Sequence, residues 1–240
     1  MEHNHDPAST LEILGAVGML TWTIVMWTAI AVLAYSRRRP VETWMLHGAT
    51  GIVALGVVGQ LGHFVEHVAQ AGYWVMRPYE PAWMTPWGTG LANGFGVVDP
   101  SKPSLGMEIL HFIGNMLFLA GLVGVMQLTR RVTYRSTARK HAKMGVWMQG
   151  IHGLEHLVLM TSVWLGAPTA IGLSTWFGLI DPGPALSTHR IWWHFLANVV
   201  GTVIFSLSLY HLWLERSQIA AAYRQPAPAV PRPAVLASAT

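Results

Sequence analysis

The sequence contains no cysteine and few charged residues. The absence of cysteine from all 240 residues excludes disulfides, thiolate metal ligands and catalytic thiols. Charged residues make up only 11% of the chain, whereas hydrophobic residues make up 52%, a balance that is unusual for a soluble domain. The composition is that of a polytopic membrane protein, and any metal in it would have to be bound through nitrogen and oxygen atoms.

Five apolar segments are each long enough, at about 20 residues, to cross the hydrocarbon core of a bilayer. They cover residues 11–35, 44–75, 106–128, 145–165 and 191–214. The sequence therefore predicts an all-α polytopic membrane protein with five transmembrane helices. Because the first segment follows an acidic tail and precedes three arginines, we expect an uncleaved span rather than a signal peptide.

The basic residues predict the orientation of these helices. Of the 15 lysine and arginine residues, only Arg77, Lys102 and Arg190 fall on the side of the N-terminal tail. The positive-inside rule then gives an outer N-terminus and an inner C-terminus in a multi-pass cell membrane, which we expect to be a bacterial plasma membrane. The basic residues form short clusters beside apolar segments, so they indicate topology and no nucleic-acid partner.

Three sequence blocks occur twice in the same order. "QLGHFVEH" (60–67) matches "QGIHGLEH" (149–156), residues 90–100 match 172–182, and "HFIGN" (111–115) matches "HFLAN" (194–198). The order predicts one N-terminal helix followed by a tandem duplication of a two-helix hairpin. We therefore divide the chain into an outer tail (1–10), a first helix with its inner loop (11–43), repeat one with a long outer loop (44–128), a basic inner loop (129–144), repeat two (145–216) and a disordered tail (217–240).

Each repeat carries the same polar residues at helical spacing. His63 and His67 are four residues apart, which brings both imidazoles to one face of a helix and within reach of one metal ion, and His152 and His156 repeat this spacing. At 1.5 Å per residue, all four motifs fall at a common depth in the outer leaflet. The expected metal ligands are His63, Glu66, His67, His111, His152, Glu155, His156 and His194. The residues expected to orient them are Gln60, Asn115, Gln149, Asn198 and Glu108.

Ionisable residues are rare inside membrane helices and often mark cofactors or ion paths. The alternative is that they only hydrogen-bond one helix to another, each contact contributing about 0.6 kcal/mol. Each repeat offers three histidines and one glutamate, an inventory that predicts two transition-metal ions, iron or copper, with zinc as a further choice.

Several functions are compatible with such a layer, and the sequence identifies no catalytic residue. The first is a membrane-embedded metalloenzyme, an oxidoreductase acting on a small apolar or membrane-associated substrate, with a zinc-dependent hydrolase as a variant. The second is a haem-binding electron-transfer protein in which His111 and His194, or pairs drawn from the two helices with histidines four residues apart, act as axial ligands. The third is a divalent-metal transporter or sensor. The expected partners are the lipid bilayer, the small substrate and either a redox protein or a second copy of the chain.

Overall fold

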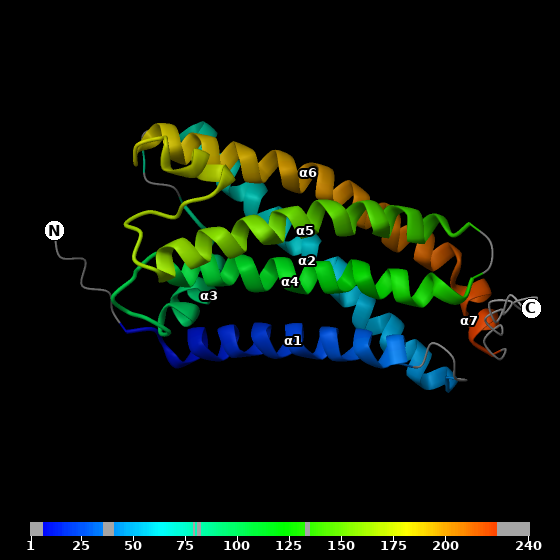
Figure 1. The fold of residues 1–240 in the computed structure, drawn as a ribbon. Helices are drawn as coiled ribbons and strands as arrows, with labels where there is room; N and C mark the ends of the chain where they lie inside the picture. The colour runs from blue at the N-terminus through cyan, green and yellow to red at the C-terminus, as the bar shows by residue number, and fades with distance from the viewer. Residues whose placement is uncertain (1–6, 36–40, 79, 81–82, 133–134, 225–240) are drawn as a thin grey trace, which may run out of the picture.

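The computed structural model describes residues 7–35, 41–78, 80, 83–132 and 135–224. Within these ranges the chain is helical and contains no β-strand. Its long helices run side by side along one axis (Figure 1): α1 (Thr10–Tyr35), α2 (Thr43–Met76), α4 (Leu105–Leu128), α5 (Thr137–Trp164) and α6 (Pro184–Leu214). The short helix α3 (Pro86–Gly96) lies at one end of the molecule and α7 (Arg216–Arg224) at the other, and two 3₁₀ turns are η2 (Thr129–Arg131) and η3 (Leu173–Gly178).

Four of the described helices are long and apolar enough to cross a membrane, namely α1, α2, α4 with its extension η2, and α6. This finding suggests that the protein is inserted in a membrane. The segment 145–165, expected as a further span, lies within α5, but that helix does not meet the same criterion of length and hydropathy. The reason is in its sequence, because basic residues fill its first turns and the polar repeat motif occupies its middle.

Helices α2, α4, α5 and α6 form a four-helix bundle. Both α4 and α6 pack against α2 and α5, and α1 packs on the outside of the bundle against α4. Glycines let α2 and α4 approach closely, since a Cβ atom on Gly121 would lie 3.0 Å from backbone atoms of Gly56 and Val57. The four helices that carry the repeat motifs therefore surround one interior.

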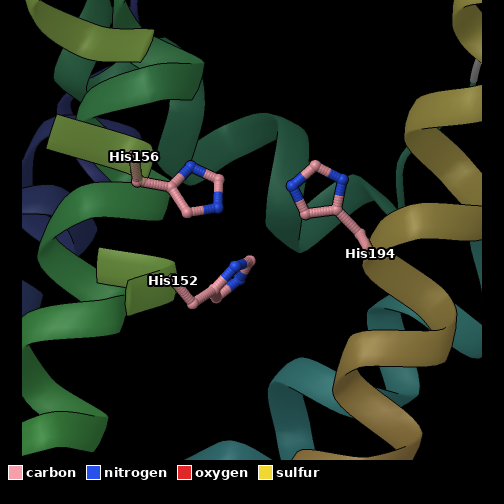
Figure 2. Close-up of side chains that lie close together, drawn as sticks. All are labelled: His152, His156 and His194. Atoms are coloured by element: carbon pink, nitrogen blue, oxygen red, sulfur yellow. The ribbon is translucent and has the colours of Figure 1, made fainter. Parts of the chain in front are cut away.

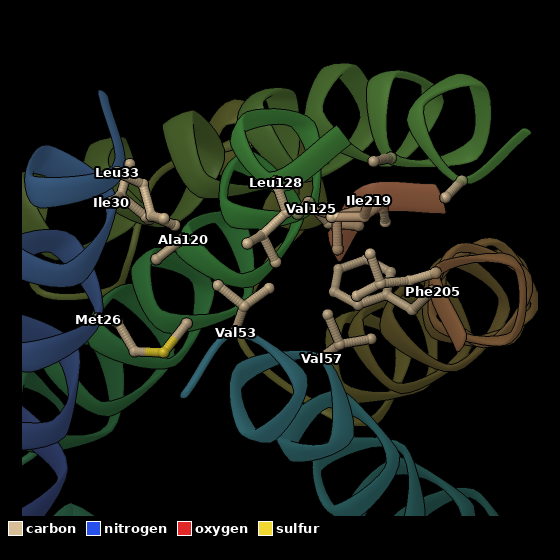
Figure 3. Packing of buried hydrophobic residues seen from close by; sticks show 14 of the residues in the cluster. Met26, Ile30, Leu33, Val53, Val57, Ala120, Val125, Leu128, Phe205 and Ile219 are labelled. Atoms are coloured by element: carbon tan, nitrogen blue, oxygen red, sulfur yellow. The ribbon is translucent and has the colours of Figure 1, made fainter. Parts of the chain in front are cut away.

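Apolar side chains fill the half of this interior that is nearer α7 (Figure 3). Val53, Val57, Val125 and Phe205 are all buried in that cluster. The cluster gives the bundle a packed, apolar base, and the polar layer lies beyond it towards the end that carries α3.

Two segments that were expected to be irregular are partly helical. Residues 217–240 were expected to be disordered, but α7 extends to Arg224 because Ile219 and Tyr223 are buried against the bundle. The expected basic loop 129–144 contains η2 and the first turns of α5. The arginines at 37–39, the first six residues of the outer tail and residues 225–240 lie outside the described residues.

Candidate metal centre

The six histidines of the repeat motifs meet inside the bundle. Their ring centroids form a connected set with neighbouring separations of 4.5 to 6.4 Å. We call this set the histidine layer; it consists of His63 and His67 from α2, His111 from α4, His152 and His156 from α5, and His194 from α6.

Contacts in one hairpin have counterparts in the other. The ring centroids are 4.5 Å apart in the His63–His67 pair and 4.6 Å apart in the His152–His156 pair, and both pairs are edge-to-face. The ring of His194 lies 5.3 Å from that of His156 and 5.7 Å from that of His67, so it contacts both pairs. The helical spacing of four residues therefore places two imidazoles together in each hairpin.

Three of these histidines point toward one another (Figure 2). His152, His156 and His194 each offer one ring nitrogen such that the three nitrogens lie within 4.8 Å of one another. The Nε2 atoms of all three, together with Nδ1 of His156, are buried and have no hydrogen-bond partner among the described residues. Buried polar atoms are normally paired, so three unpaired lone-pair donors facing each other make an arrangement that could hold a metal ion.

The other three histidines are arranged in a related way. The Nε2 atoms of His63 and His67 are hydrogen-bonded to each other at 3.1 Å, and two imidazoles on one metal ion place their ligand nitrogens at a similar separation, roughly 3 to 3.5 Å. The ring of His111 lies 6.1 Å and 6.4 Å from these two rings. This group is therefore more open than the one that contains His194.

Backbone carbonyls fix the protonation of the two histidines on α4 and α6. The Nδ1 atom of His111 donates to the carbonyl of Met107 at 2.9 Å, and Nδ1 of His194 donates to the carbonyl of Arg190 at 2.7 Å. A carbonyl can only accept, so each Nδ1 carries the proton and the neutral ring keeps its lone pair on Nε2. Both rings are thus held as Nε2 ligands.

The glutamines and asparagines expected to orient the histidines pair across the two hairpins. Nε2 of Gln60 donates to Oδ1 of Asn198 at 2.6 Å, and Nε2 of Gln149 donates to Oδ1 of Asn115. Each asparagine also donates to the backbone carbonyl of the histidine four residues before it, at 2.8 Å and 2.9 Å. The amides therefore link α2 to α6 and α5 to α4 directly beneath the histidine layer.

Glu66 lies beside the layer but is hydrogen-bonded to the segment before α3. Its carboxylate accepts from the backbone amide of Thr85 at 2.9 Å and from the Thr85 hydroxyl. It also accepts from Nε2 of Gln70 at 3.2 Å, and Oε1 of Gln70 lies 3.0 Å from Nδ1 of His67. Thr85 is the N-cap of α3, so Glu66 fixes where that helix begins. Sequence reasoning missed Gln70, although its spacing of three residues from His67 could have indicated it.

Glu155 makes the corresponding connection in the second hairpin. Its carboxylate accepts from the backbone amide of Ser174 in η3 at 2.7 Å and from the indole of Trp193 at 3.3 Å. One oxygen lies 3.7 Å from Nδ1 of His152. Both predicted glutamate ligands are therefore close to the histidines, with their oxygens bonded to the connections at the α3 end.

Glu108 forms a buried ion pair that has no counterpart in the other hairpin. Its Oε1 accepts from Arg190 at 3.0 Å. Its Oε2 lies 3.9 Å from Nδ1 of His156 and has no hydrogen-bond partner in the described part of the chain, although the residue is only 1% exposed. Sequence reasoning counted Arg190 only as an outer-side charge, because nothing in the sequence links it to a glutamate 82 residues earlier.

A cavity of about 880 Å³ reaches the histidine layer from the α3 end. His111 and His194 lie at its inner limit together with Glu108 and Arg190, and α3 and the start of α6 contribute to its walls. Near its opening, hydrogen bonds from Ser101 and Lys102 hold the pKa of Asp99 below its ordinary value, so that this carboxylate is charged at neutral pH. The layer is thus connected to the end of the bundle through a polar opening.

Other histidines lie apart from the layer. His141 and His211 stack on each other with ring centroids 5.3 Å apart, toward the α7 ends of α5 and α6. His189 lies against the rings of Trp176 and Trp193. Because these histidines lie outside the layer, we expect them not to contribute to its metal binding, and they can serve as control positions on the same helices.

Comparison of the chain with known proteins gives one family. No curated protein and no solved structure matches it. The profile described as "Family of unknown function (DUF6008)" matches residues 1–237. Because the match covers nearly the whole chain, including every residue of the histidine layer, the protein belongs to the DUF6008 family.

Proposed function

We propose that this protein is a membrane oxidoreductase that binds two copper ions in the histidine layer, each held by the three histidines of one hairpin. The observation that carries the proposal is the trio of buried, unpartnered Nε2 atoms on His152, His156 and His194. Satisfying three such atoms by helix-to-helix hydrogen bonds would need donors there, and the groups recorded beside these rings are other imidazoles and the carboxylates of Glu108 and Glu155, which only accept when charged. A cation resolves this, because it takes one lone pair from each ring.

The donor set favours copper over iron. Carboxylate ligands would favour iron, but Glu66 and Glu155 are hydrogen-bonded to the segments at the α3 end. The remaining donors are imidazoles, for which divalent copper has the highest affinity in the first transition series. Copper would supply one-electron redox chemistry, while the protein's own residues would orient the imidazoles.

The corresponding contacts of the two hairpins support two ions. In this proposal the hairpins are a tandem duplication related by a pseudo-two-fold axis near His111 and His194, whose ring centroids are 6.1 Å apart. Helix α5 is then the fourth of five spans, with its polar residues facing the bundle interior, and the N-terminus lies outside. The layer would lie in the outer half of a bacterial plasma membrane.

Packing within the layer argues against a haem with His111 and His194 as its axial ligands. The ring of His156 lies 5.1 Å from that of His111 and 5.3 Å from that of His194. It therefore occupies space that a porphyrin between these two axial ligands would need. A copper pair requires no such space, because ions of this size fit between the imidazole nitrogens.

Metal titration of the purified full-length protein tests this proposal. We expect up to two equivalents of copper, tighter binding of copper than of zinc or iron, and reversible reduction by ascorbate. His152→Ala should lower the copper affinity of one site by at least about tenfold, the scale seen when coordination is perturbed. His141→Ala, which removes a histidine from the same helix outside the layer, should leave both sites unchanged.

Three results would count against the proposal. A Soret band in the protein purified from its host would show that the bound cofactor is haem and not copper. Zinc bound with no measurable redox cycling would favour a hydrolase or a transporter, which uptake into proteoliposomes would separate. Equal copper binding by wild type, His152→Ala and His141→Ala would mean that the histidine layer is not the metal site.

A further inference from the structure

The two hairpins differ at the wall of the cavity that reaches the histidine layer. Glu108 stands three residues before His111, where the second hairpin has Ile191. Arg190 stands four residues before His194, where the first hairpin has Met107. All four of these differing side chains line the cavity. The asymmetry therefore falls on a surface that a molecule in the cavity would contact.

The charged groups of the described cavity wall are already paired with one another. Arg190 lies 3.0 Å from Glu108. Lys102 lies 3.0 Å from Asp99 and also donates to the carbonyl of Trp164 at 2.8 Å. A charged ligand would have to leave water without gaining a free counter-charge, which is costly in a partly buried cavity. The wall therefore favours a neutral molecule.

One strong acceptor in this wall is left without a donor. Among the described residues, Oε2 of Glu108 has no hydrogen-bond partner: Nδ1 of His156 lies 3.9 Å away, beyond hydrogen-bond distance, and the residue is 1% exposed. A carboxylate oxygen binds an O–H or N–H group through a strong, charge-assisted hydrogen bond. The ligand should therefore carry such a donor.

The rest of the wall is suited to an apolar ring. Trp83, Met84, Val97 and Met107 line the cavity, and methionine sulfur makes favourable contacts with aromatic rings. A volume of about 880 Å³ is within the range of small-molecule sites, which combine apolar walls with a few polar groups that orient the ligand.

We propose that the cavity binds a neutral aromatic molecule bearing an O–H or N–H group, such as a phenol, with this group on Glu108 and the ring against the methionine and tryptophan side chains. This molecule would be the substrate of the centre, and in that respect the inference rests on the proposed function. Binding itself requires no metal, so it can be tested separately.

Ligand-observed ¹⁹F NMR of 4-fluorophenol with the metal-free, full-length protein in detergent tests the binding. Val97 lines the cavity and Val98 does not, although their side chains are 45% and 52% exposed. Val97→Trp should weaken 4-fluorophenol binding by about tenfold or more, and Val98→Trp should change it less than about twofold. Partitioning into protein-free micelles is subtracted from every measurement.

Three further probes test the ligand chemistry. 4-Fluorotoluene lacks the donor and should bind about tenfold more weakly than 4-fluorophenol. 4-Fluorobenzoate and 4-fluorobenzylammonium are charged and should bind more weakly still. Glu108→Gln should reduce the preference for the phenol over the toluene, whereas a purely apolar cavity would give no preference in either protein.

The proposal is overturned if 4-fluorophenol binds no better than 4-fluorotoluene, if the benzoate or the ammonium binds best, or if the Val97 and Val98 variants behave alike. These outcomes are independent of the metal titration. Copper binding with no phenol binding would overturn the substrate class alone. If the protein binds the phenol but does not bind copper, the cavity is a ligand site and the proposed oxidoreductase function is wrong.

Discussion

Replacing Arg190 with methionine should strongly destabilise the bundle. The side chain of Glu108 is 2% exposed, so Arg190→Met would leave its carboxylate buried without a counter-charge. Loss of one partner from a buried ion pair costs about 3–5 kcal/mol. Because the Arg190 side chain is itself 30% exposed, water can reach part of the pair, and we expect a loss near the lower end, about 3 kcal/mol.

A second change should restore most of this stability. Arg190→Met with Glu108→Ile places in each hairpin the residue that the other hairpin has at the corresponding position, and removes both charges. We expect the double variant to be within about 1 kcal/mol of wild type, because well-packed apolar residues often replace a buried ion pair without loss. Equilibrium unfolding of the metal-free protein in mixed micelles with increasing SDS would measure all three proteins.

The reasoning is refuted if the double variant is as unstable as Arg190→Met alone, because the loss would then come from the shape of the arginine and not from a stranded charge. It is also refuted if Arg190→Met unfolds at the same SDS fraction as wild type. In either case the ion pair would not account for the asymmetry of the cavity wall.

Two further predictions concern the framework that holds the layer. Gly121→Ala should cost about 1–3 kcal/mol in the same unfolding assay, because the added Cβ would meet the backbone of α2. Gly51→Ala should be neutral or slightly stabilising, because the added Cβ would have nothing within 4 Å. Equal effects of the two changes would contradict the close approach of α2 and α4. Glu155→Gln should speed hydrogen exchange at the Ser174 amide and through η3, because the Glu155 carboxylate accepts a hydrogen bond from that amide. Exchange in α3 should not change. Unchanged exchange in η3 would mean that the contact does not stabilise the turn.

The all-helical class and the clustering of histidines could be predicted from the sequence. A continuous apolar run of about 20 residues can cross a bilayer as a helix, in which all backbone hydrogen bonds form within the segment. Within each helix, a spacing of four residues fixes which side chains share a face, and this predicted that His63 would lie beside His67 and His152 beside His156.

Contacts between distant segments could not be predicted in this way. The pairing of Glu108 with Arg190 depends on how α4 and α6 pack, and neither helix carries a local signal for it. The helix α7 was missed because its nine residues are polar on average, and only burial of Ile219 and Tyr223 against the bundle stabilises it. Glu66 was grouped with the ligands by its position in the motif, whereas its hydrogen bonds to Thr85 depend on the path of the connection before α3.

The most direct test of the central claim is the copper content of two variants of the same helix. His194 is in the histidine layer and His211 lies further along α6, stacked on His141. After copper loading and removal of free metal, we expect about two copper ions per chain in wild type and His211→Ala and about one in His194→Ala, which removes one ligand of one ion. Equal copper content in His194→Ala and wild type would contradict the account.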